Sequence, residues 1–87
     1  MRQTEYNELK SEIHRYLDKH IVPLVNNDFS FYARNVVPIL CDLRDAMFLG
    51  MREETRMYFN RLCNEMEVRR VSEKKRKENS QLKHHAI

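Results

Sequence analysis

The stretch that decides the fold is FYARNVVPILCDLRDAMFL, residues 31–49. Placed on a helix at about 100° per residue, its apolar side chains cover much more of the circumference than the single stripe of a surface helix. Its polar side chains fall in one narrow arc, with Arg44 as the exception. Because so little of this helix can face water, more than one neighbour must cover it. We therefore expect residues 31–49 to form the central helix of the fold.

Two prolines should interrupt the helices. Pro38 lies inside the central helix, where it removes the bond to the Arg34 carbonyl and crowds that turn, so we expect a kink or a short break there. Pro23 should end or kink the preceding helix near Val22, because the residue before a proline disfavours the α conformation. The segments HIVPLV and NVVPIL around the two prolines resemble each other. Two matches of this length do not establish a duplication.

The segment before the central helix predicts a helix with one apolar face. Thr4 is a candidate N-cap, and the carboxylates of Glu5 and Glu8 would lie near the positive end of that helix. A turn rich in Asn and Asp follows, in which Asp28 or Ser30 can cap the central helix. The apolar face recurs at intervals of three and four residues and consists of Tyr6, Leu9, Ile13, Tyr16, Leu17, Ile21 and Leu24.

The path of the chain at Gly50 has two interpretations. In the first, Gly50 is a left-handed residue that ends the central helix, and a third helix returns alongside it from Met51. In the second, one long helix runs through the glycine at a cost of about 1 kcal/mol. The second is favoured by the phase of the apolar residues and by the lack of Ser, Thr, Asn, Asp or Pro between Ala46 and Glu54. A long helix would expose its apolar face unless another chain covered it.

Length and composition bound the fold class. A chain of 87 residues allows one domain with a small core, which at this size often needs a second subunit for stability. One Gly, two Pro and almost no alternation of apolar and polar residues indicate an all-α protein. We expect a small bundle of two or three helices around a kinked central helix, completed by homodimerisation.

Cysteine usage and hydropathy predict an intracellular protein. Cys41 and Cys63 both lie in helical patterns, so we expect buried, reduced side chains rather than a disulfide framework. No apolar run reaches the ~18 residues of a membrane span. The sequence MRQTEYNELK lacks the apolar region of a signal peptide. We expect a soluble protein of the cytoplasm or nucleus.

Positive charge is concentrated towards the C-terminus. Residues 1–67 hold nine Lys or Arg and eleven Asp or Glu, a net charge of −2, whereas residues 68–87 hold seven against two, a net charge of +5. We therefore divide the chain into a helical domain, residues 1–68, and a basic segment, residues 69–87. The basic segment is either an extension of the last helix or a flexible arm.

The basic segment predicts nucleic-acid binding. Runs of cations bind phosphates through counterion release and do not read the base sequence. The protein would then be a small regulatory binding protein with little sequence specificity. A solvated tail that keeps the protein soluble explains the same charges. The expected phosphate contacts are Arg69, Arg70, Lys74, Lys75, Arg76 and Lys77, extended by Arg52 and Arg56.

An alternative function is an adapter or inhibitor that docks on a larger protein. Met57, Val68 and Val71 would lie on the last helix opposite its core-facing side, where apolar side chains have no role in a two-faced helix. Such a set predicts a second interface, with the basic segment meeting an acidic patch of the partner. Scattered surface hydrophobes account for these residues equally well.

The sequence predicts neither an enzyme nor a cofactor or metal site. Gly50 is the only glycine, so the chain cannot form a glycine-rich phosphate loop. No Ser or Cys stands at a spacing from His that is typical of a nucleophile and its base. Cys41, Cys63 and the histidines lack the local spacing of a metal site. We expect no membrane and no small-molecule substrate among the partners.

Overall fold

The computed structural model describes residues 1–85, with side chains described as far as Ser72. Every element in this part of the chain is helical, which confirms the all-α class. In chain order the elements are α1 (Gln3–Tyr16), the π-helical turn η1 (Leu17–Ile21), α2 (Val22–Asn27), α3 (Phe29–Phe31), the π-helical turn η2 (Tyr32–Val36), α4 (Val37–Phe48) and α5 (Arg52–His85).

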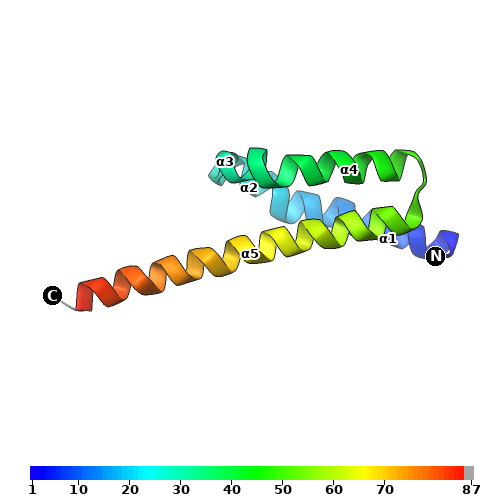
Figure 1. The fold of residues 1–87 in the computed structure, drawn as a ribbon. Coiled ribbons are helices and arrows are strands. Elements are labelled where there is room, and N and C mark those ends of the chain that lie inside the picture. The colour runs from blue at the N-terminus through cyan, green and yellow to red at the C-terminus, as the bar shows by residue number, and fades with distance from the viewer. Residues whose placement is uncertain (86–87) are drawn as a thin grey trace.

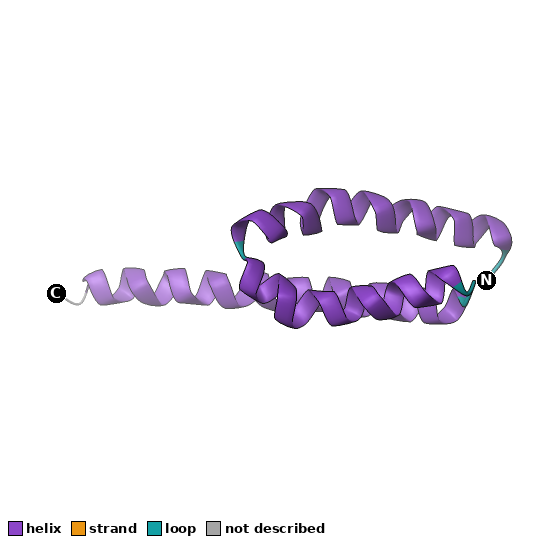
Figure 2. Ribbon diagram, turned by 90° about the horizontal axis from the view of Figure 1, so that it is seen from above, coloured by secondary structure: helices purple, strands orange, loops and turns teal. Residues whose placement is uncertain are grey.

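The elements form three rods that lie side by side. The first rod is α1, η1 and α2, the second is α3, η2 and α4, and the third is α5. α4 packs along α5, and α1 also contacts α5. Figure 1 shows that α5 continues well beyond the other two rods. Seen from above, the first rod is a curved arch beside the α4–α5 pair (Figure 2).

The core lies where the three rods meet. Thr55 is the buried polar residue among mostly apolar neighbours. Tyr16 and Leu17 are partly buried and pack against the core. The apolar face predicted for the first helix is therefore confirmed. The buried apolar side chains of the described part of the chain are Tyr6, Leu9, Ile13, Ile21, Leu24, Val36, Ile39, Leu43, Ala46, Phe59 and Leu62.

The chain reverses at Gly50, so the hairpin interpretation is confirmed and the continuous long helix is wrong. Gly50 has φ of 68°, in the left-handed region that glycine adopts without strain. Its N–H bonds to the Met47 carbonyl at 3.2 Å, and the N–H of Met51 bonds to the Ala46 carbonyl at 2.9 Å. These two bonds form a Schellman motif, which satisfies carbonyls that the end of α4 would otherwise leave unpaired.

Each proline is preceded by a π-helical turn of five residues, η1 before Pro23 and η2 before Pro38. In η1 the N–H of Val22 bonds to the carbonyl of Leu17, five residues back, and η2 repeats this pattern. A proline in a regular α-helix would clash with the carbonyl four residues earlier, and the wider turn gives that carbonyl room. π turns therefore lie where the interruptions were predicted, inside rods that stay helical, and a kink of the central helix at Pro38 stays a prediction. The first rod continues past Pro23 to the end of α2.

The prediction of Thr4 as the N-cap is wrong, because α1 begins at Gln3 and its N-cap lies two residues before Thr4. Arg2 holds the N-cap position with an extended backbone, and its carbonyl accepts a bond from the Tyr6 N–H at 3.0 Å. A residue of α5 stabilises the start of α1, because the Arg52 guanidinium donates a hydrogen bond to the side chain of Gln3. This tertiary contact, made from the far side of the Gly50 turn, is not visible in the local sequence.

Candidate functional site

Two depressions border the first rod, one on each side. The α1–α5 cleft has a volume of about 520 Å³ and lies where α5 begins to leave the body. Its lining mixes apolar side chains with both charges, and its Lys and Arg residues come from η1 and from α5, which are far apart in sequence. The lining residues are Tyr16, Lys19, His20, Pro23, Leu24, Asn27, Cys63, Met66, Glu67, Arg69 and Arg70.

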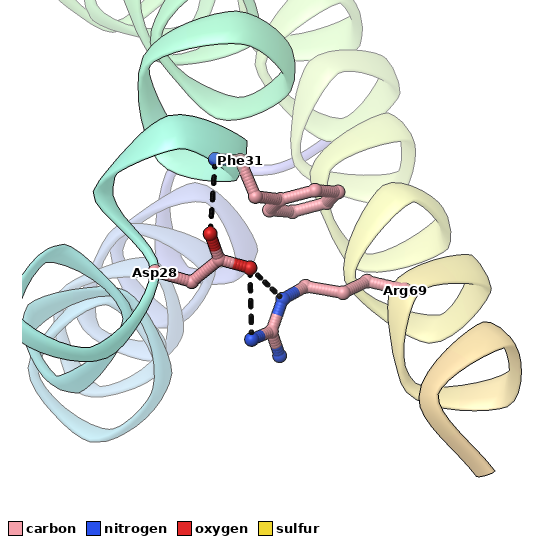
Figure 3. A network of polar contacts seen from close by, with 3 residues as sticks. All are labelled: Asp28, Phe31 and Arg69. Carbon is pink, nitrogen blue, oxygen red and sulfur yellow. Dashed lines mark hydrogen bonds and ion pairs between the residues drawn. The ribbon is translucent and has the colours of Figure 1, made fainter. Parts of the chain in front are cut away.

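Arg69 fixes α5 to the junction between α2 and α3 (Figure 3). Its Nε and Nη2 donate to Asp28 Oδ2 at 3.3 and 3.2 Å, and its guanidinium lies 5.4 Å from the centre of the Phe31 ring. Asp28 Oδ1 accepts from the Phe31 N–H at 3.3 Å, which confirms Asp28 as a helix cap. One carboxylate therefore caps α3 and anchors α5.

The other predicted phosphate contacts are spread along α5. Arg70 is exposed and pairs with Glu67 at 2.7 Å, within one helical turn. Arg52 donates to the Met1 carbonyl at 2.8 Å, so its guanidinium holds the N-terminal residues. Arg56 is exposed. Positions 52 and 69 are about 26 Å apart along a helix axis. The predicted phosphate contacts are therefore divided between the two ends of the body.

α5 includes the basic run Lys74, Lys75, Arg76 and Lys77. The side chains of this run fall outside those described. Lys19 is the cation that sequence reasoning missed. It lies on the outer side of η1 and lines the same cleft as Arg69 and Arg70. Only the packing of the first rod against α5 brings it there, so the sequence holds no local signal for it.

Two titratable side chains in the α1–α5 cleft are held in their neutral forms. Burial, together with the neighbouring Cys63 and Glu67, raises the pKa of Tyr16 to about 12. Burial also raises the pKa of the Cys63 thiol, outweighing the hydrogen bond from Tyr16, which lowers it. A thiol with a raised pKa is a poor nucleophile at neutral pH. Among the described side chains, moreover, no group of three His, Cys, Asp or Glu could hold a metal ion.

The α1–α4 groove lies on the other side of the first rod and has a volume of about 470 Å³. Its floor and walls are mostly apolar, and Cys41, which we expected to be buried, is exposed at its edge. The lining residues are Ile13, His14, Leu17, Tyr32, Val37, Leu40, Cys41, Leu43, Arg44 and Met47.

The groove leaves part of the wide apolar surface of the central helix uncovered. Only one stripe of α4 is buried, formed by Ile39, Leu43 and Ala46. The apolar side chains on the next side of the helix open onto the groove. Phe48, at the end of that side, is 88% exposed.

The apolar side chains predicted to contact a partner protein are all exposed. Met57, Val68 and Val71 have 53%, 61% and 46% of their surface exposed. Arg61 and Asn64 lie between them on the same side of α5, by helical spacing. The three side chains therefore do not form one continuous apolar patch.

Comparison with protein-family models, curated proteins and solved structures found no match for this chain. Within the described residues, none of the helices combines the length and apolar character needed to cross a bilayer.

Proposed function

We propose that this is a small non-enzymatic regulatory binding protein whose basic C-terminal part of α5 contacts nucleic-acid phosphates without strong sequence specificity. The observation that supports this function most directly is the course of α5, which runs as one helix from Arg52 to His85 and extends beyond the other rods (Figure 1). By sequence, residues 68–87 of this extension carry a net charge of +5, whereas residues 1–67 carry −2. A projecting cationic helix is a suitable partner for a phosphate backbone, because it reaches the backbone without clashes from the body.

The α1–α5 cleft extends the proposed interface. Lys19 and the exposed Arg70 lie at the base of the extension, where they can add phosphate contacts. Arg69 has a different role, because its guanidinium is engaged with Asp28. It sets the angle at which the extension leaves the body. In this proposal a phosphate at Arg69 would have to compete with the Asp28 carboxylate.

The test is fluorescence anisotropy with labelled duplex DNA and single-stranded RNA across a salt series. The full chain is compared with a variant in which Lys74, Lys75, Arg76 and Lys77 are all replaced by Gln. The proposal expects salt-sensitive binding in the wild type and a large loss of affinity in the variant, with a shallower salt slope because fewer counterions are released.

A matched control separates a basic interface from overall charge. Replacing Lys10, Arg15, Arg34 and Arg44 by Gln removes the same charge from the body of the protein. These replacements should weaken binding much less than the four replacements in α5. Absence of binding at low salt, or an equal loss in the two variants, would show that the extension is not a nucleic-acid interface.

The exposure of Met57, Val68 and Val71 favours a second candidate, the adapter that docks on a larger protein. Replacing all three by Ser should leave nucleic-acid affinity unchanged if the first candidate is right. A triple variant that loses a protein partner and keeps its nucleic-acid affinity would support the adapter. We further propose that the protein acts as a homodimer, because α4 exposes apolar side chains that one copy does not cover.

A further inference from the structure

The α1–α4 groove is lined by two of the rods, and within the described residues no third helix lies on its open side. α4 is apolar over a wide arc: Ile39 and Ala46 are buried in the core, Val37 and Leu40 line the groove, and Leu43 contributes to both. A helix that is apolar over so much of its circumference normally has neighbours on both sides. In this structure α5 and the first rod bury one part of this arc, and the part that lines the groove remains open.

An exposed aromatic side chain, Phe48, lies at the C-terminal end of α4. Phe48 lies on the same side of α4 as Val37, because eleven residues correspond to about three turns of an α-helix. Its ring is 88% exposed, which makes it the most exposed of the large apolar side chains in the described residues. The opposite end of the groove is lined by Tyr32, Val37 and Leu17. One strip of α4 therefore has an apolar projection at one end and an apolar hollow at the other.

We infer that α4 of a second copy fills the α1–α4 groove, antiparallel to the first α4. This inference rests on the homodimer proposed above and names its interface. A two-fold axis near the middle of α4 would place Phe48 of each copy against Tyr32 and Val37 of the other. The two grooves would be filled by one symmetric contact, as an isologous interface requires. Each α4 would then have helical neighbours on both parts of its apolar arc.

The charges on this side of α4 favour a second copy over a strongly charged peptide. Arg44, the one charged residue that lines the groove, forms an ion pair with Asp45 at 3.3 Å. The strip is therefore close to neutral, and two identical strips can approach without like-charge repulsion. An acidic or basic helix would gain no selective attraction there, because specificity for charged partners depends on an opposite potential.

Sedimentation equilibrium of the full chain tests the interface. We expect a monomer–dimer equilibrium that Phe48→Ser weakens by roughly a hundredfold or more, because each dimer loses two buried rings. Met57→Ser is the matched control, since Met57 is an exposed apolar residue on α5, away from the groove. It should leave the dimer unchanged. Circular dichroism should show both variants folded, because both side chains are exposed in one copy.

Cross-linking tests the register. In the proposed dimer Cys41 lies within two residues of the two-fold axis, and packed helices are about 8–10 Å apart. A short bismaleimide should therefore link Cys41 to Cys41 of the second copy when Cys63 is replaced by Ala. The reverse variant, which keeps Cys63 and has Cys41→Ser, should remain uncross-linked, because Cys63 lines the α1–α5 cleft instead.

The possible results separate this inference from the functions proposed above. A monomer at all concentrations overturns both the homodimer and its interface, and leaves the groove to a different occupant. A dimer that Met57→Ser weakens, or that cross-links through Cys63 alone, overturns the interface and keeps the homodimer. Loss of the dimer in Phe48→Ser together with cross-linking at Cys41 supports the inference. Nucleic-acid affinity is measured in a separate experiment, and its value bears neither on the homodimer nor on its interface.

Discussion

The hydroxyl of Tyr6 lies 3.3 Å from the hydroxyl of Thr55, inside the core and 49 positions away in the sequence. Thr55 Oγ1 also donates to the Met51 carbonyl at 2.7 Å. A hydroxyl has one proton to donate, so Thr55 accepts in its contact with Tyr6. The direction of the hydrogen bonds therefore runs from Tyr6 through Thr55 to the backbone, and it connects the start of α1 to the first turn of α5.

This direction predicts unequal costs for removing the two hydroxyls. Thr55→Val should lower the free energy of unfolding by about 1–3 kcal/mol, because the buried Tyr6 hydroxyl loses its acceptor. Tyr6→Phe should cost less, about 0.5–1.5 kcal/mol, since Thr55 keeps its bond to Met51. Urea unfolding of the two variants measures both values. A larger cost for Tyr6→Phe would contradict the assigned direction.

The two roles of Asp28 can be separated by substitution. Asp28→Ala removes the cap of α3 and the ion pair with Arg69, so we expect a loss of about 1–2 kcal/mol of unfolding free energy. Asp28→Asn keeps a capping oxygen and should cost no more than about 1 kcal/mol. Urea unfolding provides the measurement. The matched control is Asp42→Ala, an exposed aspartate on α4.

A double-mutant cycle with Arg69→Met isolates the ion pair. The Asp28→Asn change should have almost no further effect once Arg69 is gone, because its remaining cost is the lost pair. If the costs of the two substitutions simply add, the contact drawn in Figure 3 does not contribute to stability.

The Gly50 turn predicts a purely conformational cost. A Cβ built on Gly50 would meet no described atom within 4 Å, so only its φ of 68° opposes a larger residue. Gly50→Ala should lower the unfolding free energy by about 1–2 kcal/mol. Gly50→Asn should cost less, because asparagine adopts the left-handed region more readily. Thermal unfolding that ranks alanine equal to or above glycine would contradict the left-handed turn.

The raised pKa of Tyr16 predicts a loss of stability at high pH. An unfolded tyrosine ionises near 10.0, whereas burial holds the pKa of Tyr16 at about 12 in the folded protein. Above pH 10 the unfolded chain therefore releases this proton first and becomes relatively more favourable. The contribution of Tyr16 is complete below pH 10 and is lost progressively towards pH 12. Urea unfolding at a series of pH values should show this decline, and Tyr16→Phe should reduce it.

The two cysteines should react at different rates. Burial raises the pKa of the Cys63 thiol and limits access to it, whereas Cys41 is exposed at the edge of the α1–α4 groove. Iodoacetamide at neutral pH and low protein concentration should therefore modify Cys41 first, as mass spectrometry can show. The rates should converge in urea. Faster modification of Cys63 in the folded protein would contradict its placement.

The sequence predicts the helical class and the buried face of the first rod, because the spacing of residues such as Leu9 and Ile13 is local information. The turn at Gly50 is ambiguous at that level. Its Schellman motif uses backbone groups alone, so the missing capping residues after Gly50 are misleading evidence for a continuous helix. The anchoring of Arg69 by Asp28 depends on packing across 41 positions and has no local signal.

The candidate surfaces divide in the same way. The charge of residues 69–87 is plain in the composition, and its use for binding stays a prediction. The wide apolar surface of residues 31–49 indicates that this helix needs more than one neighbour, which is consistent with the α1–α4 groove. The side of that helix that stays open depends on where α1 and α5 pack against it. That packing is visible only in the three-dimensional structure.

The π turns change how the bundle keeps its register. Core residues seven positions apart, such as Tyr6 with Ile13, follow the repeat of a coiled coil. Across η1 the step from Ile13 to Ile21 is eight, and across η2 the step from Phe31 to Ile39 is eight as well. Each π turn therefore absorbs one extra residue, so the apolar face of the rod keeps its direction towards the core along the turn. Two insertions that would rotate the apolar face out of a regular helix are contained here within single turns.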